Sequence, residues 1–122
     1  MNGLINATVT TTGSAGSASG SASVSLVGYL NAIKIDWSAS APATSDITII
    51  EAGGLARTIY TKSNSVTDVT FYPALQQGDN TGTAITGAYG RVYIPYVALT
   101  ISIVQCDALA AACVVSFLMT DQ

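Results

Sequence analysis

The side chains that most often carry enzyme chemistry are scarce in this chain of 122 residues. It contains no histidine, seven acidic residues and two cysteines. Acid–base and nucleophilic enzymes draw on histidine, a carboxylate pair or an activated cysteine, so a Ser/His/Asp or Cys/His arrangement is impossible here. The closest acidic pair, Asp46 and Glu51, has an odd separation and should point to opposite faces of a strand. The sequence therefore predicts a protein that is not an enzyme.

Metal and redox chemistry have equally little support. Residues 78–82, Gly-Asp-Asn-Thr-Gly, resemble part of a calcium loop but lack the alternate-position ligands and closing glutamate of an EF-hand, so we interpret them as a turn. Cys106 and Cys113 fit no zinc spacing. Facing each other across a hairpin, they could form a disulfide in an oxidising compartment. The lack of a signal peptide favours two reduced, partly buried thiols instead. No metal or cofactor is expected.

The aromatic residues could serve a binding function. One tryptophan and six tyrosines are enough for a surface on which sugar rings stack. Trp37 ends an alternating apolar row and is expected in the core. Tyr89 falls in a predicted long loop, which makes it the first aromatic residue to test for contact with a ligand.

The composition bounds the possible partners. Charged residues make up 9% of the chain, against about 25% in a typical soluble domain, and hydrophobic residues make up 49%. The net charge is −3 and the four basic residues are scattered, which argues against a nucleic-acid partner. So few charges leave much neutral surface for packing against other chains. We expect a subunit of an assembly, with a monomer that has a Ser/Thr-covered surface as the alternative.

Two segments bear on membranes and secretion. The N-terminal residues have no positive region and no apolar core of signal-peptide length. Residues 99–119 are the one candidate membrane span, but Gln105 and Asp107 lie at its middle, where a charge is costly. A hairpin of two strands explains this stretch better, and no membrane partner is expected.

Apolar and polar residues alternate with a period of two along almost the whole chain, which predicts an all-β protein. The length fits a single domain spanning residues 1–122. We expect one antiparallel β-sandwich of jelly-roll or Greek-key type, with about seven to nine strands. The glycine-rich residues 74–90 are expected to form a long irregular loop of the kind that makes contacts. The predicted strands are residues 4–12, 17–26, 27–37, 46–52, 57–62, 66–72, 91–94, 97–106 and 113–119.

The segment 13–23, Gly-Ser-Ala-Gly-Ser-Ala-Ser-Gly-Ser-Ala-Ser, looks like a flexible tether. From Ser17 to Leu26, however, serines alternate strictly with small or apolar residues, as in a strand. Residues 13–16 then form a turn, and residues 1–26 form an N-terminal hairpin or arm. Because an alanine methyl recovers only about 0.8 kcal/mol on burial, such a strand needs paired hydrogen bonds and a close neighbour. A mobile arm is the alternative.

That close neighbour is either another part of the same subunit or a second chain. The residues predicted to form an interface are those of the apolar and small faces of the N-terminal segment, together with the aromatic residue in the long loop. They are Leu4, Ile5, Val9, Ala18, Gly20, Ala22, Val24 and Tyr89.

Four features stand in a characteristic order: the strand at residues 28–36, the strand at 46–49 after a Ser/Ala/Pro loop, the Thr-Phe-Tyr-Pro strand end at 70–73 and the hydrophobic final hairpin. This order resembles that of the head decoration, or cement, proteins of tailed bacteriophages. The resemblance covers most of the chain from about residue 5. It implies a jelly-roll-like sandwich, often a homotrimer, on the outer capsid surface of the virion where subunits of the major capsid protein meet. It supplies no catalytic residue.

Two other functions remain open. A carbohydrate-binding or host-binding sandwich from a tail fibre or adhesin would use exposed aromatic residues between positions 74 and 90. A self-assembling filament or matrix subunit would polymerise by itself.

Overall fold

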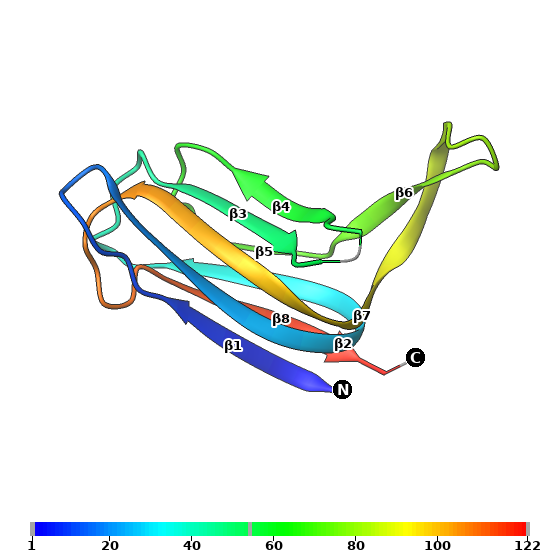
Figure 1. The fold of residues 1–122 in the computed structure, drawn as a ribbon, viewed down its shortest axis with the longest axis horizontal. Coiled ribbons are helices and arrows are strands. Elements are labelled where there is room, and N and C mark those ends of the chain that lie inside the picture. Colours follow the sequence, from blue (N-terminus) through cyan, green and yellow to red (C-terminus); the bar gives the residue numbers. More distant parts are fainter. Residues whose placement is uncertain (1, 54, 122) are drawn as a thin grey trace.

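The computed structural model describes residues 2–53 and 55–121, and the all-β prediction is confirmed. The strands pair only in antiparallel fashion and form one hydrogen-bonded network (Figure 1). Their bounds are β1 Gly3–Val9, β2 Ala18–Trp37, β3 Asp46–Glu51, β4 Thr58–Lys62, β5 Val69–Phe71, β6 Ala74–Gly78, β7 Ala84–Cys106 and β8 Cys113–Thr120.

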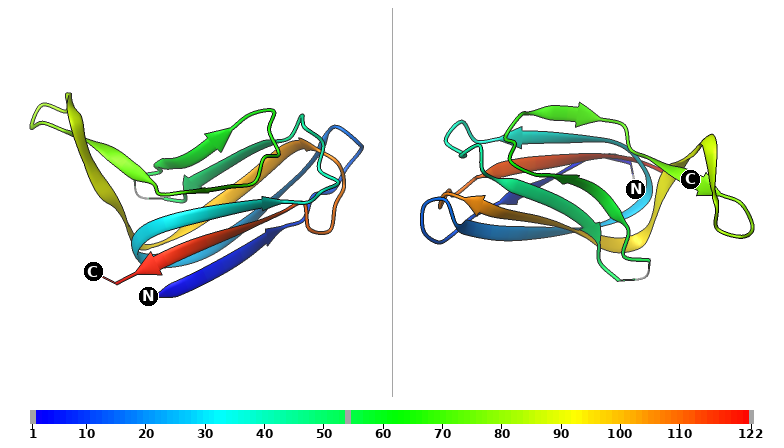
Figure 2. Two further views of the ribbon diagram at one scale, coloured as in Figure 1. Left: turned by 180° about the vertical axis from the view of Figure 1, so that it is seen from behind. Right: turned by 90° about the horizontal axis from the view of Figure 1, so that it is seen from above.

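The sheet is bent because its two longest strands change partners along their length. β2 pairs with β7 along residues 18–30, with a register shift after Leu26, whereas its second half, residues 29–37, pairs on its other side with β8 and, at residues 33–35, with β5 as well. Half of the sheet therefore has the order β1-β8-β2-β5 and the other half the order β2-β7-β3-β4. With β2 counted once in each half, this is the strand order of a jelly roll. Figures 1 and 2 show β2 turning back on itself at one end of the molecule.

The turn in β2 occurs at Gly28, where the pairing with β7 shifts register. Gly28 has φ 116°, a backbone conformation open to glycine and strained for other residues. On the opposite strand Tyr96 has φ 54°, so both chains of the ladder deform at the same level. A register shift of this kind bends a sheet and increases its twist, which lets one long strand serve both halves.

The core consists of the inward-facing residues of both halves, so a single buried cluster joins them. The residues follow the predicted alternation, since every second position of β3, of the second half of β7 and of β8 is buried. Trp37 is buried, as expected. The largest fully buried side chains are Phe117, Leu26, Leu30, Ile33, Ile35, Ile47, Ile49, Ile94, Leu99, Ile101, Ile103 and Met119.

The N-terminal segment is ordered, but not as the predicted hairpin. β1 pairs along its whole length with β8, and the bridge between Thr12 and Ser19 is what joins it to β2. The turn at residues 13–16 is fixed by the connection between β7 and β8, since the Gly16 backbone amide donates a hydrogen bond to the Asp107 carboxylate at 2.8 Å. The hairpin prediction failed because local alternation identifies a strand but not its partner, and residues 113–119 offer a more apolar strand to pair with than residues 17–26.

Residues 74–90, predicted to be an irregular loop, instead form a β-hairpin. β6 pairs with the first part of β7, and the hairpin projects from the body of the molecule (Figures 1 and 2). We call residues 74–91 the arm. The four glycines of this segment are the reason why the sequence predicted a loop here. The pairing of the two strands is irregular between Gln76 and Gly78.

The apolar stretch at residues 99–119 spans the end of β7, a turn and β8. Within residues 2–53 and 55–121 there is no helix long and apolar enough to cross a membrane.

Candidate functional site

The acidic side chains that could have supported catalysis serve the fold instead. Asp46 accepts a hydrogen bond from the Asn64 amide at 2.8 Å, and Asp68 accepts one from the Trp37 amide at 2.7 Å. In the described part of the chain no group of three or more His, Cys, Asp or Glu residues could hold a metal ion. These carboxylates are committed to fixing loops against strands.

Glu51 is the one acidic residue that is fully buried among those described, and it pairs with Arg57. The Arg57 guanidinium donates to both carboxylate oxygens and also to the carbonyl oxygen of Tyr93 at 2.8 Å. The pair thus ties the connection between β3 and β4 to β7. Because both charges are compensated within the site, we assign it a structural role.

The two cysteines are free and buried. Burial raises the pKa of Cys113 to about 12, with smaller contributions from Asp36, Asp68 and Cys106. A thiol with such a pKa is protonated and a poor nucleophile at neutral pH. The prediction of reduced thiols agrees with this arrangement, although both are more deeply buried than expected.

The residues predicted to form an interface divide into two groups. Most of them pack inside the subunit: Val9 and Ala18 are in the core, and Ile5, Ala22 and Val24 are partly buried against it. Gly20 faces the backbone of Thr10 and Thr11 so closely that a Cβ would overlap the Thr10 carbonyl group. Leu4 and Tyr89 are exposed, by 62% and 61%.

Position 20 therefore needs a glycine because its own subunit packs against it. The backbone of Thr10 and Thr11 passes close to β2 at Gly20, and the Thr11 side chain reaches the turn between β7 and β8. Its hydroxyl donates to the Asp107 carbonyl oxygen at 2.5 Å and accepts from the Leu109 amide at 3.0 Å. The close neighbour that we expected for this strand therefore belongs to the same subunit.

The most exposed large apolar residues belong to elements at one end of the molecule. This is the end where the arm projects and where the chain termini, the β3–β4 turn, the β5–β6 connection and the bend of β7 lie (Figure 1). These elements carry the most exposed large apolar residues, which are Leu55 at 79%, Tyr72 at 77%, Tyr96 at 73%, Leu4 at 62% and Tyr89 at 61%. An accumulation of exposed apolar groups marks a contact surface. We call this region the apolar end.

The base of the arm is held by one arginine. The Arg91 guanidinium lies over the ring of Tyr29 and donates at 3.3 Å to Asn31 Oδ1 and to Thr120 Oγ1. Tyr29 also meets Tyr93 edge to face, with ring centroids 5.4 Å apart. These residues come from β2, β7 and β8, so they fix where the arm leaves the body. Sequence reasoning missed this cluster because its members are far apart along the chain.

The tip of the arm is closed by Asp79. Its carboxylate accepts hydrogen bonds from the amides of Thr81 and Thr83, at 2.8 and 3.0 Å, and from the Thr81 hydroxyl at 2.7 Å. The Thr81 hydroxyl, followed by these amides, lowers the pKa of Asp79. Residues 78–82 thus form a turn whose carboxylate is used by the backbone, as the sequence predicted.

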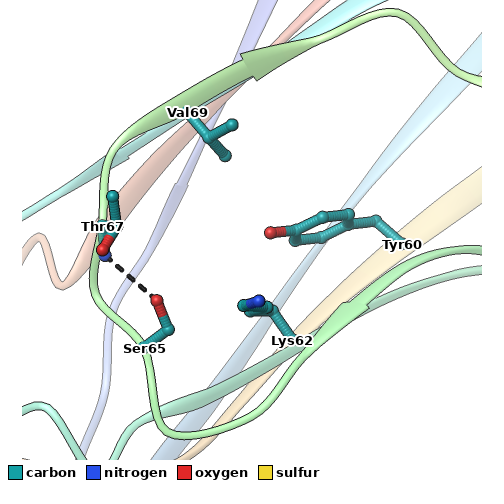
Figure 3. Close-up of a pocket in the computed structure, with 5 residues that line it drawn as sticks. All are labelled: Tyr60, Lys62, Ser65, Thr67 and Val69. Carbon is teal, nitrogen blue, oxygen red and sulfur yellow. Dashed lines mark hydrogen bonds between the residues drawn. The ribbon is translucent and has the colours of Figure 1, made fainter.

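A shallow pocket lies between β4 and β5, which face each other without pairing. It has a volume of about 280 Å³ and is lined by Tyr60, Lys62, Ser65, Thr67 and Val69 (Figure 3). The Tyr60 ring stacks on Phe71 at a centroid distance of 4.6 Å, which leaves its hydroxyl pointing into the pocket. Burial raises the pKa of Tyr60. Neutral hydroxyls with one ammonium group suit a small polar or anionic ligand, and sequence reasoning missed this site.

The outer face of the β2-β7-β3-β4 half is covered with hydroxyl groups. Ser21, Ser102, Thr48 and Thr61 lie opposite one another across four strands. Cross-strand contacts connect them and the next row, such as Ser23 to Thr100 at 3.1 Å. Hydroxyls thus take the place that charged side chains occupy on most soluble proteins.

Comparison with known proteins gives no relative for this chain, since no family model, no curated protein and no solved structure matches it.

Proposed function

We propose that the chain is a structural virion protein: a decoration, or cement, subunit that binds the outer surface of a bacteriophage head and stabilises contacts between major capsid subunits. The observation that carries the proposal is the arm. β6 pairs with β7 and with no other described strand, so the arm is free to contact another molecule. The resemblance noted in the sequence gives the class of partner.

The surface chemistry supports permanent packing over catalysis. The arm carries Ile85 and Tyr89, exposed by 44% and 61%, and the apolar end surrounds its base. The carboxylates described above are engaged in the fold, and the Cys113 thiol is buried. A protein of this kind acts by binding. Many copies on a lattice would add their individual affinities by avidity.

Co-sedimentation with empty heads of the virus that encodes the chain tests the proposal. We expect the protein to bind such heads and to raise the temperature at which they rupture. Replacing Ile85 and Tyr89 together by serine should weaken binding at least tenfold. The matched control replaces Ile50 and Val104, which are exposed by 38% and 45% on the hydroxyl-covered half, and should bind normally. If the wild-type protein fails to bind the heads, the proposal is wrong.

A second candidate, a carbohydrate-binding or host-binding module, is favoured by the pocket between β4 and β5. Tyr60 and Lys62 supply a hydroxyl and a positive charge, which are groups that bind polar ligands such as sugars. Titration of the labelled protein with neutral and acidic monosaccharides, followed by NMR, tests this function. Chemical-shift changes at Lys62 and Ser65 that disappear in Lys62→Gln would favour it. Unchanged spectra at high sugar concentration would eliminate it.

A further inference from the structure

The body of the molecule has one long strand edge without protection against pairing with another chain. In the sheet order β1 is terminal, so no described strand lies beside one edge of its backbone. Its seven residues, Gly-Leu-Ile-Asn-Ala-Thr-Val, contain no charge and no proline. Natural proteins usually guard exposed edges with lysine, proline, bulges or very short strands. None of these features is present in β1.

The other open edges of the body are guarded. β4, at the opposite end of the sheet order, ends in Lys62 and is irregularly paired with β3 between Ile49 and Ile50. β5 has only three residues. The contrast makes β1 the edge at which a further strand can be added.

The arm supplies a second open edge, on β6. β6 has the sequence Ala-Leu-Gln-Gln-Gly, again without charge or proline, and β7 covers one of its sides. The arm segment of β7 is less regular. Gly87 has φ 80°, and four residues of β7 lie between Ala84 and Tyr89, which are the partners of Gly78 and Gln76. An isolated two-stranded hairpin is marginally stable in water. A third strand beside β6 would stabilise the arm.

We propose that β6 of one copy of this chain pairs with β1 of a second copy. The two surfaces are different, so the contact is heterologous, and repetition closes it into a ring or extends it into a filament. A projecting arm can reach an edge on another molecule, whereas a body edge meeting a body edge brings two bulky sheets together. Neither strand carries a charge, so two copies of net charge −3 can approach here without local repulsion.

This contact goes beyond the proposed function, which concerns binding to the head surface, and does not depend on it. The tests below use purified protein without capsids, so failure of self-pairing and failure of capsid binding are separate results.

Cysteine trapping tests the contact directly. Both native cysteines are buried, so introduced thiols on the surface will react first. Chains carrying Gln76→Cys together with a cysteine at position 4, 6 or 8 are oxidised and separated on a denaturing gel. These three positions lie on one face of β1 and sample the registers that β6 allows. We expect one double variant to give covalent dimers and trimers, and each single variant to stay monomeric.

Charge substitution gives an independent test in solution. By analytical ultracentrifugation, Asn6→Lys and Gln76→Lys should each raise the apparent dissociation constant at least tenfold. Combining Asn6→Lys with Gln76→Glu should restore association. The matched control is Ser21→Lys on the hydroxyl-covered face, which should associate as the wild type does.

Three results would overturn the inference. The first is a wild-type protein that remains monomeric at all concentrations. The second is cross-linking of a single variant, which means that β1 pairs with β1 or arm with arm. The third is an oligomer that the lysine substitutions leave intact.

Discussion

The guanidinium of Arg91 lies 3.9 Å from the centre of the Tyr29 ring, and this contact joins the arm to the body of the protein. Arg91 pairs with Ala74 at the base of the arm, and Tyr29 directly follows the bend in β2 at Gly28. The position of the arm thus depends on the same region that folds the sheet over.

Arg91→Gln should destabilise the protein by about 1 kcal/mol, since a cation–π contact at an exposed site is worth about that much. Two hydrogen bonds from Arg91 to Asn31 and Thr120 are lost as well. Urea denaturation measures the change, and hydrogen exchange should show faster opening of residues 74–91. Lys34→Gln, at an exposed position of β2, is the control and should change stability little. Equal exchange rates in Arg91→Gln and the wild type would show that the arm is held by other contacts.

Removal of the Glu51 carboxylate should cost about 3 kcal/mol, because it leaves the Arg57 charge without its partner in a largely buried site. Thermal and urea unfolding of Glu51→Ala measure this loss. Asp36→Asn, at an exposed position, serves as the control. A double variant with apolar residues at both positions should recover part of the loss, and a stability of Glu51→Ala equal to that of the wild type would contradict the structural role.

Gly20→Ala tests why the N-terminal strand has small side chains. A Cβ at Gly20 would overlap the Thr10 carbonyl group and lie 3.1 Å from the Thr11 Cα atom. We expect a loss of roughly 1–3 kcal/mol by overpacking, measured by urea denaturation. Ser21→Ala, its exposed neighbour, should be close to neutral. If Gly20→Ala unfolds like the wild type and only self-association weakens, then the small face packs against another chain instead.

The cysteines should resist alkylation in the native state and react only on unfolding. Since burial raises the pKa of Cys113 to about 12, the folded protein retains a proton that the unfolded chain loses above its ordinary thiol pKa. The contribution of Cys113 to stability is thus complete below the unfolded pKa and falls as the pH rises toward 12. Cys113→Ala should flatten this alkaline loss in unfolding curves measured at increasing pH. Rapid labelling of the native protein at neutral pH would contradict this prediction.

The tip of the arm should respond to acid. Hydrogen bonds from Thr81 and Thr83 lower the pKa of Asp79, so its ionised form stabilises the turn above the unfolded pKa, and this is lost as the pH falls through the folded value. Hydrogen exchange at the Thr81 and Thr83 amides should accelerate in Asp79→Ala relative to the wild type at neutral pH. Asn80→Ala, a substitution in the same turn that keeps the Asp79 carboxylate, should leave these amides protected.

In the N-terminal segment the existence of a strand could be predicted from the sequence, but its partner could not. The alternation of residues 17–26 predicted a strand, and β2 contains it. The same alternation could not predict that β1 would pair with β8, because strand pairing depends on contacts more than a hundred residues apart in the chain. The arm was missed for a related reason, since glycines and uncharged polar residues allow both a loop and an exposed hairpin.

The amino-acid sequence by itself determined the all-β class, the inward faces of most strands, the buried Trp37 and the turn at Asp79. These features depend on local periodicity and on turn chemistry, which the order of residues encodes directly. Only the tertiary structure decided the bend of β2 at Gly28, the projecting arm, the pocket between β4 and β5 and the open edge of β1. Each of these arises where strands distant in the chain meet or fail to meet, and side-chain alternation is the same in either case.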